Sequence, residues 1–231
     1  MNNDSVVDGN LGANEPLSGW LRLGKRVFMT DGTTAAAYQV RLGDGVSVDD
    51  ILATFLFQVP TALVRGSFDR VSLPLQEFCE LPEFMCTPGN DVTVADSLAL
   101  APGSYGALRV GSGATVDLDP NATYTFCSVR VGRNAFVQSS DQTTIGVVGN
   151  VTIGAGSKLW TPAVVNDLPL VLYVGGTTVR LSQAAVVEAV ITAPNAKLKI
   201  QRDGALYGCF CTNQLTTDKE VLLECVDTTG P

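Results

Sequence analysis

Short alternating phrases that end in glycine recur along this chain and constrain its fold more than any other feature. Four of them are VRLG at 40–43, LRVG at 108–111, VRVG at 129–132 and VTIG at 151–154, with LRLG at 21–24 and VRLS at 179–182 as close variants. Successive glycines lie about 20 residues apart, the period of a solenoid repeat. The phrases predict an all-β chain that forms a right-handed parallel β-helix with coils of about 20 residues.

The segments between the phrases are short, rich in Val, Thr, Leu and Ile, and bounded by turn residues, which is typical of strands. Residues 48–58 fit both a helical and a strand period, and we favour a strand. A segment rich in Pro and Cys at 79–91 divides N-terminal coils at 1–78 from a main β-helix at 92–225, followed by a tail at 226–231. Two subdomains and one interrupted solenoid both fit this division.

Stacked coils would satisfy their strand edges along the whole axis and turn alternate apolar side chains into the interior. One position of the phrase is then directed outward, and it is basic in most copies: Arg22, Arg41, Arg109, Arg130 and Arg180, with Thr152 in the remaining one. The pattern predicts a basic stripe on one face. A solvated face that discourages edge aggregation and a ladder that binds carboxylates are the two interpretations.

The composition restricts the classes of function. The chain has 15 basic and 23 acidic residues, a net charge of -8 and no histidine. The net charge opposes binding to nucleic acid or anionic lipid, and the absence of histidine removes the usual proton shuttle and the commonest metal ligand. The chain as given has no secretory signal pattern and no apolar run long enough for a membrane helix, so we expect no membrane insertion in this segment.

Six cysteines, Cys79, Cys86, Cys127, Cys209, Cys211 and Cys225, form an even set without the paired spacings of a zinc site. They favour disulfides in an oxidising compartment, with buried free thiols as the alternative. Of the pairings, a local bridge between Cys79 and Cys86 is the first choice. Cys209 and Cys211 share one face of a strand, so neighbouring strands would supply their partners, with Cys127 and Cys225 as candidates.

The words LAPGSYG at 100–106, ATVDL at 114–118 and ATYTFC at 122–127, with APNA at 193–196 and LYG at 206–208, resemble a family of exported bacterial parallel β-helix domains. Members of that family occur in surface or pilus-associated proteins of poorly characterised function and are similar to bactofilins in general architecture. The resemblance covers most of 90–225 and, more loosely, 8–78. It implies a fold and an exported location, but it carries over no catalytic set.

Chemistry-bearing residues are scattered. Parallel β-helices can host carbohydrate-cleaving sites built from clustered carboxylates, for which the candidates are Asp117, Asp119, Asp141, Glu188 and Asp203. These carboxylates occur singly among turns, and no calcium-loop pattern is present. The tryptophans Trp20 and Trp160 fit either a carbohydrate platform or a cover over the core. Threonines at 123, 125, 143, 144, 177 and 178 lack the strict repeat of an ice-binding ladder.

We therefore expect no catalytic, cofactor or metal site. The leading hypothesis is a non-enzymatic, exported β-helical module of a cell surface or appendage that stacks end to end, because terminal coils expose strand edges unless they are capped. Its expected partners are further copies of itself or other surface components, and not nucleic acid. The alternative is a β-helix that binds or cleaves carbohydrate.

Overall fold

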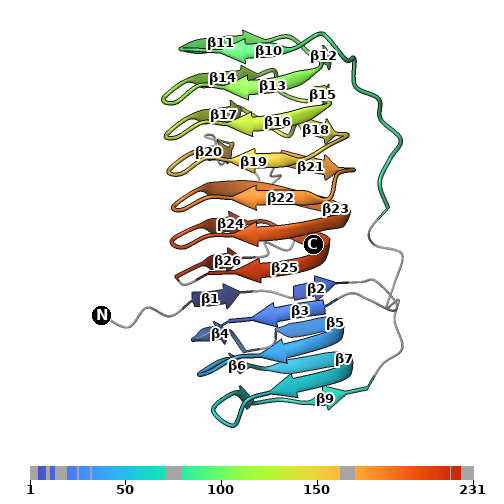
Figure 1. Cartoon of the computed structure of the whole chain (residues 1–231), viewed down its shortest axis with the longest axis vertical. Helices are drawn as coiled ribbons and strands as arrows, with labels where there is room; N and C mark the ends of the chain where they lie inside the picture. Colours follow the sequence, from blue (N-terminus) through green and yellow to red (C-terminus); the bar gives the residue numbers. More distant parts are fainter. Residues whose placement is uncertain are drawn as a thin grey trace.

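The structure, a computed structural model, describes residues 5–8, 11–13, 20–24, 26–31, 33–70, 80–161, 170–218 and 220–224. Within these residues the chain is all β and contains no helix, and its strands pair in parallel to form a solenoid of about 10 coils (Figure 1). The predicted fold class is confirmed. Residues 48–58 are extended, as favoured from sequence, in β6 (Ser47–Val48) and β7 (Asp50–Gln58).

Each coil contributes strands to three faces, which we number in chain order. Face 1 contains, from one end of the rod to the other, β11 (Ser97–Leu100), β14 (Thr115–Leu118), β17 (Phe136–Ser139), β20 (Lys158–Trp160), the start of β23 (Val186–Ile200), β24 (Ala205–Tyr207), β26 (Leu222–Glu224), β1 (Ser5–Asp8), β4 (Val27–Met29), β6 and β8 (Leu63–Val64).

Face 2 follows the same order along the rod. It contains β12 (Gly103–Ser104), β15 (Thr123–Phe126), β18 (Thr144–Val147), β21 (Leu170–Val174), the middle of β23, the start of β25 (Phe210–Thr217), β2 (Leu11–Ala13), the starts of β5 (Thr34–Leu42) and β7, and β9 (Phe68–Asp69).

Face 3 carries the recurring phrases. It contains β10 (Val92–Val94), β13 (Ala107–Val110), β16 (Ser128–Val131), β19 (Val151–Ile153), β22 (Thr178–Leu181), the ends of β23 and β25, β3 (Trp20–Leu23), and the ends of β5 and β7. The ten strands of this face span about 43 Å at the usual separation of hydrogen-bonded strands.

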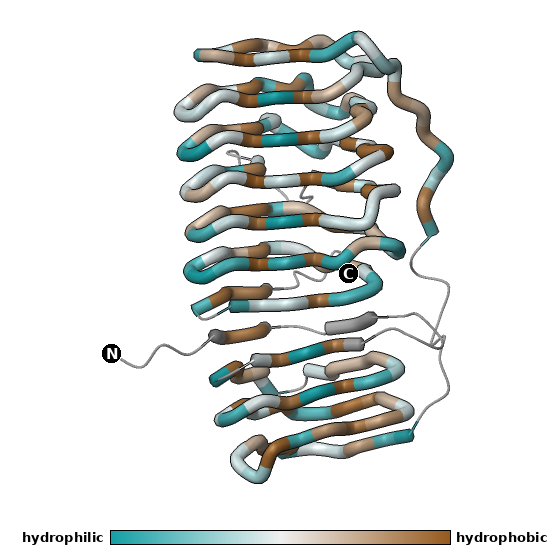
Figure 2. Tube along the Cα trace, viewed as in Figure 1, coloured by the Kyte–Doolittle hydropathy of each residue, from teal (hydrophilic) through white to brown (hydrophobic). Residues whose placement is uncertain are grey.

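The core is a set of in-register apolar columns inside the solenoid. The strands alternate between buried and more exposed positions, which Figure 2 shows as alternating apolar and hydrophilic segments. One inward column of face 3 runs through nearly every coil: Val92, Leu108, Val129, Val151, Val179, Leu198, Leu215, Leu21, Val40 and Leu56. Burial of such columns supplies the main driving force for the fold.

The order of the coils along the rod differs from their order in the sequence. The N-terminal coils start in the middle of the rod and wind to the bottom end in Figure 1, and residues 80–91 lie along the outside of the rod and lead to its top end. Residues 92–224 wind back down to the middle. The first and last described strands, β1 and β26, therefore meet in the middle of one continuous solenoid, so its coil order is a circular permutation of the chain order.

The two halves meet at a junction made of ordinary parallel strand pairs. On face 1, β26 pairs with β1, and on face 3 the end of β25 pairs with β3. Directly paired side chains on the two sides are buried, including Leu223 with Val7 and Leu215 with Leu21. We call this contact the mid-rod junction. It uses the same stacking that joins consecutive coils elsewhere.

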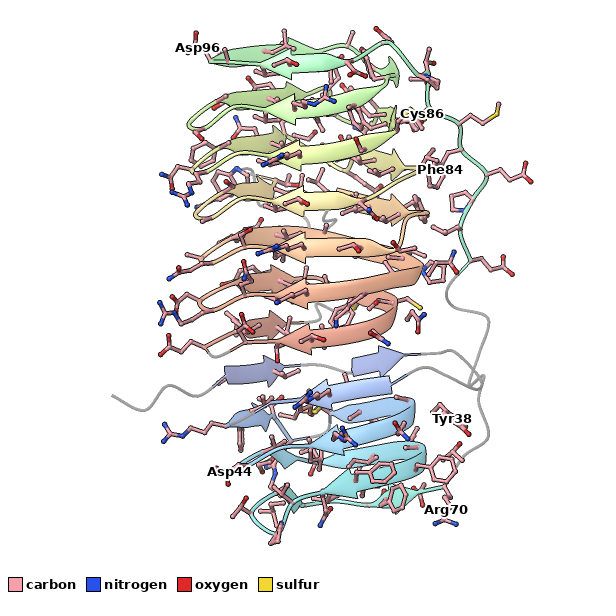
Figure 3. The ribbon with its side chains drawn as sticks, viewed as in Figure 1. Tyr38, Asp44, Arg70, Phe84, Cys86 and Asp96 are labelled. Carbon is pink, nitrogen blue, oxygen red and sulfur yellow. A yellow bond between two sulfur atoms is a disulfide. The ribbon has the colours of Figure 1, made fainter. Side chains whose placement is uncertain are left out.

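The return segment, of which residues 80–91 are described, lies along the outside of face 2 near the top end (Figure 3). The Oγ of Ser104 donates to the Met85 carbonyl over 2.9 Å, and the Thr87 amide donates to the Tyr105 carbonyl over 3.1 Å. The chain from residue 70 to residue 91 reaches about 70 Å when extended, which exceeds the length of the rod. The connection is therefore long enough to link the two ends.

A disulfide between Cys86 and Cys127 fixes the return segment to the coil that holds β15 and β16. The predicted local bridge between Cys79 and Cys86 is wrong, because the return segment carries Cys86 past the body of the solenoid and beside Cys127 on its surface. Cys127 is for the same reason not a partner of Cys209 or Cys211, which are themselves disulfide-bonded. Cys79 and Cys225 lie outside the described residues.

The glycines that end the phrases lie at the corner between face 3 and face 1, where backbones of consecutive coils approach closely. A Cβ on Gly132 would lie 2.7 Å from the carbonyl carbon of Gly111, which real Cβ atoms do not tolerate. The next glycine in the stack, Gly154, meets the backbone of Gly132 in the same way. These glycines are thus required by close packing of the corners.

Candidate functional site

The carboxylates predicted as candidates lie at separate places on the solenoid. Asp117 is directed outward on face 1 and accepts a hydrogen bond from Gln138 Nε2 over 2.7 Å. Three coil spacings, about 14 Å, separate it from Glu188 on the same face. Paired carboxylates of glycosidases lie about 5–10 Å apart, so these two do not form such a pair.

Asp119 and Asp141 are brought closer, because they lie in corresponding turns of consecutive coils. Asp141 accepts hydrogen bonds from Asn121 Nδ2 over 3.1 Å and from the Gln142 amide over 2.7 Å. The backbone of Asp119 bonds to the hydroxyls of Tyr124 and Thr143. These contacts hold the turns together, which is the usual role of an Asp at such a position.

Glu188 lies beside Trp160 in the register of face 1. Burial raises the pKa of its carboxyl, against the effects of a hydrogen bond from the Thr161 amide and of the Lys158 charge. The Lys158 ammonium lies 4.5 Å from the centroid of the Trp160 ring. The Trp160 ring is therefore in contact with Lys158 of the same strand. The side chain of Trp20 lies outside what the structure describes.

Asp203 forms part of a polar ladder at the corner between faces 3 and 1. A hydrogen bond with the Glu220 side chain, and after it one with Gln183, lowers the pKa of Asp203. Gln183 Nε2 lies 3.3 Å from Asp203 Oδ2, and Arg202 is paired with the same carboxylate at 3.5 Å. The ladder connects turns of successive coils at the rod surface.

The threonines named from sequence do not form a continuous ladder. Thr123 and Thr144 are paired neighbours on face 2, but Thr125 pairs with Gly146. Thr143 is buried, and its hydroxyl shares a hydrogen bond with the Ser139 hydroxyl within the turn, with 2.8 Å between the two oxygens. Thr178 belongs to face 3.

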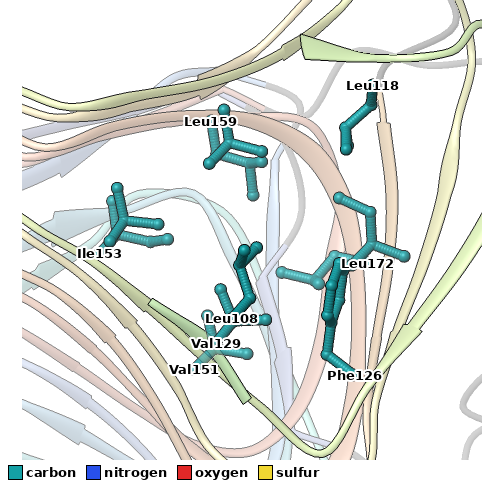
Figure 4. A pocket seen from close by; sticks show the side chains of 11 residues that line it. Leu108, Leu118, Phe126, Val129, Val151, Ile153, Leu159 and Leu172 are labelled. Carbon is teal, nitrogen blue, oxygen red and sulfur yellow. The ribbon is translucent and has the colours of Figure 1, made fainter. Parts of the chain in front are cut away.

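An apolar pocket lies in the interior between stacked coils (Figure 4). Its volume is about 10 Å³, close to the minimum for one water molecule, and its lining offers no polar partner for a water. The pocket is a packing void of the core. Its lining residues are Leu108, Leu118, Phe126, Val129, Val131, Val137, Ile145, Val151, Ile153, Leu159 and Leu172.

Among the residues that the structure describes, no group of three or more Cys, Asp or Glu side chains is arranged to hold a metal ion. In the same described part, no helix is long and apolar enough to cross a membrane.

The two ends of the rod expose side chains that belong to the interior columns. At the top end, Leu98 pairs with buried Val116 and so faces inward, but it is 37% exposed. At the bottom end, Phe68 pairs with buried Ile51 and is 39% exposed. The outermost strands β8 to β12 each pair with a strand on one side only, within the described residues. Both ends therefore present unpaired edges and uncovered apolar groups.

The outward residues of face 3 form a column of cations, as predicted from the phrases. The register places in order Thr93, Arg109, Arg130, Thr152, Arg180, Lys199, Thr216, Arg22, Arg41 and Phe57. We call the six basic members the basic column. The sequence patterns did not indicate Lys199 as a member. They also did not indicate that the column continues through the mid-rod junction, because Arg22 and Arg41 precede the other members in the chain.

Comparison with known proteins adds no relative: no family model, no curated protein and no solved structure matches this chain. The geometry of the ends and of face 3 is therefore the basis for assigning a role.

Proposed function

We propose that this protein is a non-enzymatic structural module of a cell surface or appendage, of the kind implied by the resemblance to exported β-helix domains, and that it assembles end to end. The observation that carries the proposal is the mid-rod junction. There, two solenoid ends that are far apart in the sequence are joined by parallel strand pairing and by buried contacts such as that between Leu215 and Leu21.

The two free ends of the rod offer the same two kinds of contact as the mid-rod junction, namely strand edges and apolar side chains. The bottom end presents the outer edge of β7 and the top end that of β10, and all strands of face 3 run parallel. A second copy docked top to bottom would continue the parallel sheet and cover Leu98 and Phe68. Uncapped solenoid ends with exposed apolar groups promote such association, because unpaired edges template further strands.

Replacing the two inward-facing end residues, Leu98 and Phe68, by lysine tests this assembly. We expect the wild-type protein to form rods whose mass rises with concentration in sedimentation velocity and whose length varies in electron micrographs. The variant Leu98→Lys/Phe68→Lys should be monomeric, because a charge would be buried in the docked joint. Thermal unfolding reports whether each variant keeps its fold.

The matched control is Met85→Lys/Val148→Lys, which adds the same charge at exposed apolar positions on the side of the rod. We expect it to assemble like the wild type. A wild-type protein that stays monomeric at millimolar concentration, or a control as monomeric as the end variant, would contradict end-to-end assembly.

We further propose that the protein is exported and works in an oxidising, extracellular location. The disulfide between Cys86 and Cys127 supports this location, since such bonds persist mainly outside the cytoplasm. In protein recovered from its native cells under acid quench, Cys86 and Cys127 should resist alkylation until a reductant is added. Full alkylation without reductant would argue for a reducing compartment.

A further inference from the structure

We propose that face 3 binds a linear acidic polysaccharide, with carboxylates of the polymer held along the basic column. This inference goes beyond the structural role and does not depend on end-to-end assembly, because one rod carries the complete column. The argument rests on the segregation of charge, on the presence of only one acidic partner for the column among the described residues, and on the spacing of the cations.

Charge is segregated on this rod. The protein carries a net charge of -8, but the outward positions of the described face 3 strands contain no Asp or Glu. Within the described strands, the second outward column on this face is neutral apart from Lys197: Ala107, Ser128, Thr178, Gln214, Gln39 and Phe55 complete it. Asp91, just before β10 and beside Ala107, is the one acidic neighbour found there among the described residues, and it is paired with Arg109. Face 1, by contrast, carries Asp117 and Glu188 at outward positions.

In the part of the chain that the structure describes, only one member of the basic column, Arg109, is paired with an acidic side chain. Arg109 is paired with Asp91 at 2.8 Å, Arg180 donates to Gln201 over 3.2 Å, and Arg41 lies over the Phe57 ring. Among the described residues, no hydrogen bond, ion pair or ring contact is found for the charged groups of the remaining three members: Arg22, Arg130 and Lys199. Their charged groups are therefore available to a ligand.

The basic side chains are also stacked in like-charged pairs. Directly opposed like charges destabilise neighbouring strands, and folding alone gives no reason to repeat them. The column nevertheless contains three adjacent pairs separated by single threonines. In rod order, the pairs are Arg109 with Arg130, Arg180 with Lys199, and Arg22 with Arg41, with Thr152 and Thr216 between them. A bound polyanion would remove the repulsion at all three.

The geometry selects the kind of polyanion. The column is straight and holds six cations over about 34 Å, which suits an extended polymer with regularly spaced charges. Duplex DNA carries one charge per about 1.7 Å, several times this density, and the net negative charge of the protein would repel it strongly. Arginine binds carboxylate in a planar, two-bonded geometry, which five of the six basic residues can provide. A chain of uronic acid sugars fits these requirements.

Titration calorimetry of the full chain with polygalacturonate oligomers at low salt tests the proposal. We expect binding that is lost with fully methyl-esterified polygalacturonate, which has no charge. The variant Arg22→Gln/Arg130→Gln/Lys199→Gln should bind on the order of tenfold more weakly, because three charge-assisted contacts are removed. These side chains are at the surface, so thermal unfolding should show a retained fold.

The matched control is Arg26→Gln/Arg133→Gln/Arg202→Gln, which changes the net charge equally at exposed turn positions beside face 3. We expect it to bind polygalacturonate within about twofold of the wild type. Equal weakening in both variants, no binding at low salt, or equal binding of the esterified polymer would overturn the proposal. Tighter binding of a single-stranded oligodeoxythymidylate of equal charge would overturn the assignment to a polysaccharide.

Discussion

Removal of the disulfide between Cys86 and Cys127 should lower the free energy of unfolding by about 2–4 kcal/mol. The bond joins residues separated by 41 positions in the chain, and the chain-entropy model gives about 4 kcal/mol for a loop of that size. It also fixes the return segment to the coils beneath it. Urea denaturation of Cys86→Ser/Cys127→Ser under oxidising conditions measures the effect.

The single variants Cys86→Ser and Cys127→Ser serve as internal controls, since each loses the same covalent bond. We expect both to fall close to the double variant when a mild alkylating agent blocks the remaining thiol. A double variant as stable as the wild type would show that the return segment contributes nothing to the stability of the rod.

Truncation of the apolar contact at the mid-rod junction should have an effect of similar size. Leu21 and Leu215 are fully buried and directly paired across the junction. Each of Leu21→Ala and Leu215→Ala should lower the free energy of unfolding by about 2–5 kcal/mol, because a cavity remains in the core. The double variant should show a coupling of about 0.5–3 kcal/mol, as expected for residues in contact.

The matched comparison is a cycle between Leu21 and Leu108, which is also buried but lies several coils away. Those two substitutions should be additive within about 0.5 kcal/mol. If the coupling energy between Leu21 and Leu215 were as small as that between Leu21 and Leu108, the two halves would unfold independently and the junction would not form in solution.

The local structure could be predicted from sequence because it depends on local patterns. Alternation of apolar and polar residues indicates strands, and the glycines that close the phrases occupy corners where a side chain does not fit, as at Gly132. The same alternation placed Arg109 and Arg130 on an outward face before their pairing was known. Period and turn chemistry were sufficient for these features.

The permuted order of the coils could not be predicted in this way. The phrases at 21–24 and at 108–111 are nearly identical, so neither half carries a local sign of which end meets the other. The pairing of Leu215 with Leu21 joins segments from opposite ends of the chain and depends on the path of the return segment. The partner of Cys86 depends on the same path, which is why a local bridge was predicted wrongly.

The candidate binding face was only partly predictable for the same reason. Arg41 and Arg180 were placed on one outward stripe from the phrase alone, and the pairing of Arg180 with Lys199 then extends it. The alternation of basic pairs with threonines runs in sequence order from Arg109 to Thr216, but its continuation from Thr216 to Arg22 exists only in the order of the coils along the rod.

The mid-rod junction also has a consequence for the order in which the chain can fold during synthesis. The N-terminal coils leave the ribosome before the main β-helix, but the strands that cover β1 and β3 belong to residues 214–224, about 190 residues later in the sequence. The edge of the N-terminal half therefore stays uncovered until residues 214–224 have been synthesised, and such an edge is open to pairing with another nascent chain. Of the described coils, the last to be synthesised is the one that closes the middle of the rod.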